Sequence, residues 1–213
     1  MFKKLLSACL LTIAGSLALV GCTINHNYGL IQPIVGITDL APVAQQTRQV
    51  VGLYTDGLLG SCSMVVIAPG LALTAAHCQD LQLTKGFVKM EDGQTYEVAG
   101  LVPDPTGRDL AVMHIPEITC PCAEMALYPA RMDEAAVVVG YPLGIGQIIT
   151  TGFIQSRYTS EDGEDFLFAT TPVAPGNSGG GLFVVRQGKA YLVGILVILA
   201  SGANHLSGSV ELP

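Results

Sequence analysis

The chain contains no tryptophan, and only 13% of its 213 residues are charged, whereas 50% are hydrophobic. This composition excludes an intrinsically disordered protein, because disorder requires low hydrophobicity and high net charge. The 25 glycines and 12 prolines are instead suited to many turns between short strands. The composition predicts a compact all-β fold, and the length suits one such domain or two small barrels that share a core.

Basic residues are also scarce. The leader described below contains Lys3 and Lys4, and without them eight basic residues face 17 acidic ones, for a net charge of −9. Such a surface repels the phosphates of nucleic acids and of anionic lipids. We therefore expect no nucleic-acid partner, and any attachment to a membrane must depend on a lipid instead of on charge.

Histidine occurs four times, and no two histidines have the spacing of metal ligands such as His-x-x-x-His. His26, His114 and His205 lie in a polar segment, an apolar strand and a C-terminal loop, where we expect structural or solvated roles. The sequence does not support a metalloprotease, and we expect neither a metal nor a cofactor.

The N-terminus has an apolar stretch from Leu5 to Val20, which is shorter than a stable membrane span and ends at small residues. This pattern predicts a cleaved signal peptide over residues 1–21, with an uncleaved anchor helix as the alternative. Leu19-Val20-Gly21-Cys22 resembles the bacterial lipobox, which implies acylation of Cys22 with a fatty acid such as palmitate. The resemblance implies a lipid anchor in the bacterial envelope, and Thr23 favours the outer membrane of a Gram-negative cell.

Ala174-Pro175-Gly176-Asn177-Ser178-Gly179-Gly180-Gly181 places one hydroxyl among glycines, between two apolar runs. Because the turn has little side-chain bulk, a substrate carbonyl could reach the Ser178 hydroxyl and the backbone N–H groups of Gly176 and Ser178. This is the layout of a nucleophile with an oxyanion hole. A serine of this kind needs a histidine base and a carboxylate that orients the histidine.

Leu73-Thr74-Ala75-Ala76-His77-Cys78 supplies a candidate base, and Asp109, at the start of an apolar strand, supplies the acid. The order His77, Asp109, Ser178 is that of chymotrypsin-type enzymes. These motifs resemble the trypsin/chymotrypsin superfamily, in particular its bacterial HtrA-like and glutamyl-endopeptidase-like branch. The resemblance extends from about residue 50 to about residue 210. Asp109 has the alternative of a strand-initiating turn residue.

The resemblance implies an all-β, chymotrypsin-like fold of two six-stranded antiparallel barrels, with the active site in the cleft between them. Residues 22–46 are then a lipid-proximal tether and residues 47–213 the protease domain, with barrel 1 at about 47–116 and barrel 2 at about 134–213. Turn signals divide these regions into the expected strands, at 49–55, 60–68, 71–74, 87–90, 94–102, 110–115, 135–141, 147–158, 165–171, 181–185 and 190–200.

Four cysteines remain after Cys9 and Cys22 are set aside, and export favours disulfides. By resemblance, Cys62 and Cys78 form the superfamily's disulfide beside the catalytic histidine, with free buried thiols as the alternative. Cys120-Pro121-Cys122 lies in the connection between the barrels. It could be a local or intermolecular disulfide, which we favour, a pair of thiols or a soft-metal site.

By resemblance, the base of the specificity pocket lies near Pro172 and Val173, and one wall lies near Val197 and Leu199. None of these residues offers a charge to a buried ionic side chain, which would be costly to bury without a partner. We therefore expect cleavage after small or medium apolar residues.

The sequence thus predicts an envelope-anchored serine endopeptidase that cuts peptide bonds of a protein or peptide substrate through an acyl-enzyme. A non-enzymatic binding or scaffold protein on the same fold and a serine esterase are the alternatives. The chain ends at Pro213 with no room for the peptide-binding domain that HtrA-like proteases append, so we do not expect targeting or oligomerisation of that kind.

Overall fold

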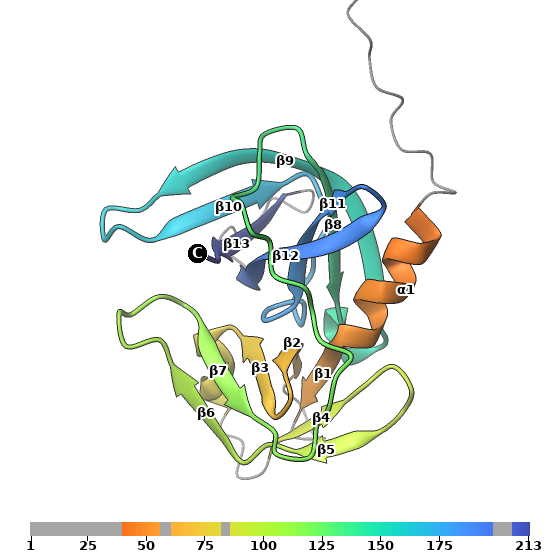
Figure 1. The fold of residues 1–213 in the computed structure, drawn as a ribbon. Coiled ribbons are helices and arrows are strands. Elements are labelled where there is room, and N and C mark those ends of the chain that lie inside the picture. The colour runs from red at the N-terminus through yellow and green to blue at the C-terminus, as the bar shows by residue number, and fades with distance from the viewer. Residues whose placement is uncertain (1–39, 56–60, 82–85, 198–205) are drawn as a thin grey trace, which may run out of the picture. The chain divides into compact units, whose positions relative to one another are not determined.

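Strands arranged in two antiparallel sheets make up most of the computed structural model, which describes residues 40–55, 61–81, 86–197 and 206–213. All of them belong to one compact unit, residues 35–213 (Figure 1). The predicted signal peptide, Cys22 and Leu199 lie outside the described residues. This all-β, chymotrypsin-like architecture confirms the predicted fold class.

The first sheet has seven strands in the order β5-β4-β1-β2-β3-β7-β6. They are β1 (Val51–Thr55), β2 (Ser61–Ala68), β3 (Leu71–Thr74), β4 (Phe87–Lys89), β5 (Thr95–Glu97), β6 (Gly100–Pro103) and β7 (Ala111–His114). The segment 94–102, which we expected to be one strand, is divided into β5 and β6, and these pair at opposite edges of the sheet. The first unit is therefore a curled seven-stranded sheet, and the prediction of six strands was wrong for this half.

Val98 and Ala99 explain the division of that strand. The N–H of Val98 donates to the Gly86 carbonyl beside β4, and the N–H of Ala99 donates to the His114 carbonyl of β7, at 3.0 and 2.9 Å. Successive residues thus bond to opposite edges of the same sheet, which is possible only if the sheet curls until its edges approach each other.

The second sheet is a closed barrel in the order β10-β13-β12-β11-β8-β9, and it confirms the predicted six strands. They are β8 (Ala135–Gly140), β9 (Ile148–Thr159), β10 (Asp165–Ala169), β11 (Gly181–Arg186), β12 (Lys189–Val197) and β13 (Ser207–Glu211). We did not anticipate β13, because Ser-Gly-Ser-Val-Glu lacks the β-branched alternation of a strand. Pairing with β10 and β12 on its two sides holds it in place.

A helix, α1 (Ala41–Val50), precedes β1, where we expected a tether as far as residue 46 and a strand from residue 49. Its buried residues Val43, Thr47 and Val50 lie on one face at helical spacing, and Pro42 is tolerated because it lies in the first turn. Gln46 accepts from the Ala190 N–H and donates to the Ala190 carbonyl, at 3.1 and 3.2 Å. These bonds attach the helix to β12.

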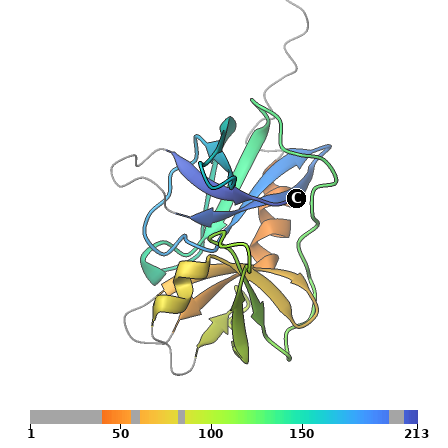
Figure 2. The ribbon, with the colours of Figure 1, turned by 90° about the vertical axis from the view of Figure 1, so that its left-hand side faces the viewer.

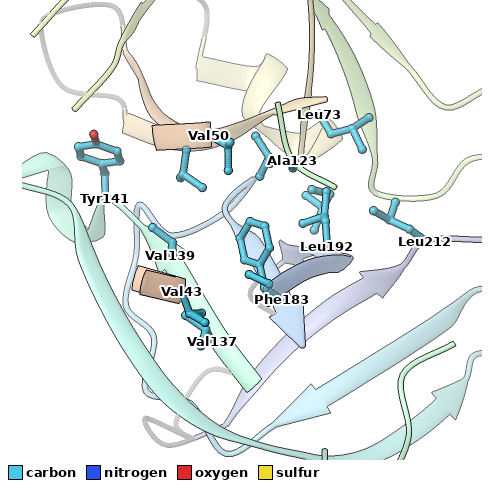
Figure 3. Close-up of a cluster of buried hydrophobic side chains, with 14 of the residues drawn as sticks. Val43, Val50, Leu73, Ala123, Val137, Val139, Tyr141, Phe183, Leu192 and Leu212 are labelled. Atoms are coloured by element: carbon cyan, nitrogen blue, oxygen red, sulfur yellow. The ribbon is translucent and has the colours of Figure 1, made fainter. Parts of the chain in front are cut away.

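The two sheets share their hydrophobic core. One cluster joins Val43 of α1 and Leu73 of the first sheet to Val137, Phe183 and other barrel residues (Figure 3). A second cluster joins Met64 and Met113 of the first sheet to barrel residues that include Val197. Because apolar contacts cross from sheet to sheet, the two halves hold each other at a fixed separation.

The connection between the sheets, residues 115–134, runs along one side of both (Figure 2). Arg186 holds it by donating to the carbonyls of Tyr128 and Pro129 and by pairing with Glu134. Cys120 and Cys122 within it form a local disulfide, one of the possibilities that the sequence left open. In the part of the chain that the structure describes, no helix is both long and apolar enough to cross a membrane.

Candidate active site

His77 lies in the short 3-10 helix η2 (Ala76–Leu81), which follows β3 directly. The next residue, Cys78, forms a disulfide with Cys62 at the start of β2, as the resemblance implied. Cys78 is fully buried and Cys62 is 4% exposed. The covalent link therefore holds the histidine turn against β2, while the His77 side chain itself is 44% exposed.

Asp109 lies two residues before β7, in a sharp turn where the Leu110 N–H donates to the Arg108 carbonyl at 2.6 Å. The Asp104 carboxylate organises the loop that leads to this turn, because it accepts from the backbone of Thr106 and from the Arg108 guanidinium. Hydrogen bonds from the Thr106 hydroxyl and backbone lower the pKa of Asp104 to about 2. The loop that presents Asp109 is thus held by a carboxylate that is ionised at neutral pH.

Asp109 binds His77 through both of its oxygens. Oδ2 lies 2.7 Å from His77 Nδ1, and Oδ1 accepts from the backbone N–H of His77 at 2.9 Å. Burial raises the pKa of Asp109, but the hydrogen bonds from His77 outweigh it, so the pKa lies below its ordinary value. An ionised carboxylate can only accept, so Nδ1 must carry the proton, and Nε2 of the neutral ring is the basic nitrogen.

Glu164 also contacts this pair, and the sequence reasoning missed it. The residue lies at the tip of the β9–β10 hairpin of the barrel, and its Oε1 accepts from the Asp109 N–H at 3.1 Å. Burial is the main reason why the pKa of Glu164 is raised, and the nearby Asp109 charge adds to it. Glu164 lies 55 positions after Asp109, and no sequence motif indicated the contact.

Ser178 lies in the turn between β10 and β11, and it is 5% exposed. Gly176 and Gly179 have φ values of 95° and 83°, which residues with a side chain rarely adopt. A Cβ on Gly179 would collide with the Ser63 carbonyl and the Thr74 hydroxyl. The glycines are therefore needed both for the conformation of the turn and for its close approach to β2 and β3.

The backbone of this turn leaves two N–H groups available. The Pro175 carbonyl accepts from the Leu143 N–H at 2.7 Å, and the Asn177 carbonyl accepts from the Gly180 N–H at 2.8 Å. In a trans peptide the N–H points opposite to the carbonyl, so the N–H groups of Gly176 and Ser178 point away from these partners. Neither N–H has an acceptor among the described residues. They have the arrangement of an oxyanion hole.

The Ser178 turn is attached directly to the strands that carry the histidine. The Ser63 N–H of β2 donates to the Ser178 carbonyl at 2.7 Å, and Cys78 Sγ lies 3.9 Å from the same oxygen. The fold thus brings the nucleophile turn from one sheet to the disulfide next to His77 of the other sheet.

The four residues predicted for the specificity pocket differ in exposure. Pro172 is exposed, Val173 is half-buried, and Val197 is 2% exposed within the cluster shared by the sheets. Leu199 lies outside the described residues. Because Val197 exposes almost no surface, it can affect such a pocket only through the residues that cover it. The specificity pocket remains a prediction.

A cluster of possible metal ligands also lies at the site. One ligand atom from each of Cys62, His77 and Cys78 lies within 4.8 Å of the other two. The two sulfurs are bonded to each other, so neither is the thiolate that a metal ion requires. Among these three residues, only His77 could therefore bind a metal ion.

Comparison with known proteins gives the same fold and the same class of site. The sequence profile of the family described as "Trypsin-like peptidase domain" matches residues 60–195. The periplasmic pH-dependent serine endoprotease DegQ of Escherichia coli is 29% identical over 162 residues, which cover 73% of this chain and 34% of DegQ. The serine protease PepD of Mycobacterium tuberculosis is 30% identical over 198 residues, which cover 79% of this chain and 41% of PepD. The chain thus spans about a third of the length of DegQ.

Two solved structures show the likeness in three dimensions. An inactive form of Rv3671c from M. tuberculosis H37Rv gives a TM-score of 0.69 at 22% identity, and the match covers 80% of this chain and 84% of that one. A variant of the HtrA-type protease AlgW with a tripeptide gives 0.68 at 25% identity, covering 81% and 59%. With the profile match over more than half of the sequence, these findings lead to one conclusion: the chain belongs to the trypsin-like peptidase family, with HtrA-type and DegP-type serine proteases among its relatives.

Proposed function

We propose that this chain is a serine endopeptidase that uses Ser178 as nucleophile, His77 as base and Asp109 as the orienting acid. The observation that carries the proposal is the pair of hydrogen bonds that the ring and backbone of His77 donate to Asp109. They lie in the same site as a serine turn whose Gly176 and Ser178 N–H groups have no acceptor among the described residues. A binding protein has no need for a histidine whose tautomer is set by a carboxylate. It equally has no need for two N–H groups without an acceptor beside the hydroxyl of a buried serine.

The reaction follows from the roles of these groups. Ser178 Oγ attacks the peptide carbonyl carbon while its proton passes to His77 Nε2. The negative charge that develops on the carbonyl oxygen is stabilised by the N–H groups of Gly176 and Ser178. His77 then gives the proton to the leaving amine as the C–N bond breaks, which leaves an acyl-enzyme. Water, activated by the same histidine, hydrolyses the ester and regenerates Ser178.

The test compares wild type with Ser178→Ala and His77→Ala. We expect a fluorophosphonate to label the wild type alone, and labelled casein to be cut by the wild type alone, with a loss of several orders of magnitude in each variant. Thermal unfolding of the variants checks that their fold is retained. If either folded variant kept full proteolytic activity, the catalytic role assigned to the substituted residue would be wrong. Labelling and ester cleavage without casein cleavage would indicate an esterase, and no labelling of the wild type would indicate a binding protein.

For the substrate, we propose cleavage after small or medium apolar residues. Pro172 and Val173 supply no charge that could neutralise an ionic side chain. Profiling with a peptide library decides this point, because a preference for Lys, Arg, Asp or Glu on the acyl side of the cut would show that the pocket is wrongly placed.

For the location, we propose the cell envelope, with the active site on the periplasmic or extracellular side. The disulfide of Cys62 and Cys78 supports an oxidising compartment, and relatives such as DegQ are described as periplasmic. Lipid attachment at Cys22 belongs to the same proposal.

A further inference from the structure

Ser63, on β2 next to the disulfide, connects the parts of the site more than any other residue does. It is fully buried, and all of its polar groups are engaged. Its hydroxyl donates to the Gly176 carbonyl at 2.9 Å and accepts from the Tyr141 N–H at 2.8 Å. Its own N–H donates to the Ser178 carbonyl at 2.7 Å, and its carbonyl accepts from the Thr74 hydroxyl at 2.8 Å.

These bonds supply two of the four donors to the carbonyls of residues 175–178 in the Ser178 turn. The carbonyls of residues 175–178 each have one donor, and Ser63 provides the donors for Gly176 and Ser178. Leu143 and Gly180 provide the other two. The Ser63 backbone bond would remain with any side chain, whereas the bond to Gly176 requires the hydroxyl. The side chain therefore acts on one peptide of the turn, which joins Gly176 to Asn177.

This peptide adjoins the one that joins Pro175 to Gly176 and carries the Gly176 N–H, so the two peptides together set the direction of that N–H. With φ at 95°, Gly176 has no side chain to limit its rotation, and only bonds to its two flanking peptides keep its N–H in one direction. The Leu143 N–H holds the carbonyl of the first of these peptides. The Ser63 hydroxyl holds the carbonyl of the second, whose Asn177 N–H donates to the Ala174 carbonyl at 3.1 Å. Without the hydroxyl, the partly buried Gly176 carbonyl and the buried Tyr141 N–H would each lose a partner. The peptide would then be held by the bond of the Asn177 N–H to Ala174, and rotation would give its carbonyl a new partner.

We infer that the Ser63 hydroxyl is a positioning group that holds the oxyanion hole open by fixing the Gly176–Asn177 peptide. The inference rests on the proposed function, because it assigns a catalytic purpose to a buried serine outside the triad. Ser63 touches no substrate and acts only through Gly176. Its removal should therefore lower kcat, because the hole acts on the transition state, and should leave KM almost unchanged.

The experiment uses Ser63→Ala, with Ser209→Ala as a matched control. Ser209 is also a fully buried serine on a strand, but its hydroxyl has no hydrogen-bond partner. Both variants delete one buried hydroxyl, and only the first deletes bonds to the nucleophile turn. We expect kcat on a peptide substrate to fall about 10- to 100-fold in Ser63→Ala, less than the loss on removing an oxyanion donor itself. In Ser209→Ala, kcat should equal that of the wild type.

A second measurement does not depend on activity. In protein labelled with 15N-glycine, the Gly176 amide should give one resonance in the wild type and in Ser209→Ala, and a broadened or doubled resonance in Ser63→Ala. If the wild type proves to have no protease activity, the proposed function fails, and this spectrum still tests the conformational role of Ser63. Should Ser63→Ala not fold, Ser63→Gly removes the same hydroxyl, leaves space for a water, and is expected to change kcat and the Gly176 resonance in the same direction.

The inference is overturned by a folded Ser63 variant that keeps wild-type kcat and a single, unshifted Gly176 resonance. A purely structural role would have a different signature, in which the melting temperature falls while kcat and the resonance stay as they are. That result would also overturn it.

Discussion

Asp109 holds His77 through both the ring and the backbone, so the two oxygens of its carboxylate have different roles. Oδ1 fixes the position of the histidine turn, and Oδ2 fixes the tautomer of the ring. An asparagine at this position keeps an oxygen that can accept from the His77 N–H. It presents an uncharged amide to the ring, so the tautomer and the charge of the intermediate are no longer stabilised.

We therefore expect Asp109→Asn to fold like the wild type and to lose about 10³- to 10⁴-fold in kcat, as this exchange does in the general triad. Steady-state kinetics and thermal unfolding measure the two effects separately. A variant that is inactive only because its melting temperature has collapsed would show instead that Asp109 has a structural role alone.

The two disulfides should differ in how readily they are reduced. Cys120 is exposed, and backbone bonds at Ile118 and Ala123 hold the chain on either side of the pair, so a bridge across one residue adds little restraint. The bridge of Cys62 to Cys78 is buried and spans 16 positions, which stabilises the fold on the order of 3 kcal/mol.

In a dithiothreitol titration followed by alkylation and mass spectrometry, we expect the Cys120 pair to be reduced first, with proteolysis retained. Reduction of the Cys62 pair should require conditions that also unfold the chain. Simultaneous reduction of both pairs, or loss of activity with the first, would contradict this assignment.

At the scale of the elements, the β9–β10 hairpin joins the barrel to the loop that carries Asp109. Its tip is closed by bonds between Ser160 and Glu164, and Glu164 then caps the Asp109 N–H. The charged groups that face Glu164 are Asp109, Arg108 and Asp104. Its raised pKa means that the folded protein binds a proton at Glu164 more readily than the unfolded chain does.

The sign of the pH effect follows from this difference. The contribution of Glu164 to stability is present below its unfolded pKa and is lost as the pH rises through its folded pKa. Glutamine can still accept from the Asp109 N–H but does not ionise. We expect the melting temperature of Glu164→Gln, relative to wild type, to increase between pH 4 and pH 7.

Glu161→Gln is the matched control, because Glu161 is an exposed carboxylate in the same turn. Its melting temperature relative to wild type should not follow the trend of Glu164→Gln. If the melting temperatures of both variants, relative to wild type, changed with pH in the same way, the pH effect would come from the general charge of the turn and not from the contact with Asp109.

At the scale of the whole molecule, the residues of the candidate site come from two sheets that a shared core holds together. His77 and Asp109 belong to the curled sheet, and Ser178 and Glu164 belong to the barrel. Their alignment therefore depends on clusters that include residues from both sides, such as Leu73 and Phe183 (Figure 3). A substitution that leaves a cavity in these clusters can therefore disturb the alignment of the two sheets and reduce activity, although it changes no residue of the site.

The proposed lipid attachment also concerns the protein as a whole. From the lipobox-like Leu19-Val20-Gly21-Cys22, we expect the mature chain to begin at an acylated Cys22. Intact mass spectrometry of membrane-extracted protein, with Cys22→Ser as control, measures this directly. An unmodified cysteine or a retained signal peptide would contradict the prediction.

The sequence by itself determined the parts of this protein that depend on local chemistry. The glycines around Ser178 and the motif around His77 indicated the chemistry and the fold, and turn residues marked most strands. The local sequence pattern did not predict the structure of segments whose conformation depends on contacts with other strands. The Ser-Gly-Ser-Val-Glu strand β13 forms only between β10 and β12, the strand at 94–102 divides because the sheet curls, and α1 forms where its apolar face meets β12.

Only the tertiary structure decided how the site is supported. Ser63 and Glu164 act on Gly176 and Asp109 across 113 and 55 positions, and each contact exists because two sheets close on each other. A hydroxyl or a carboxylate in a sequence shows no preference for a distant carbonyl or N–H. Such a bond forms only after hydrophobic burial has fixed the two backbones within about 3 Å of reach.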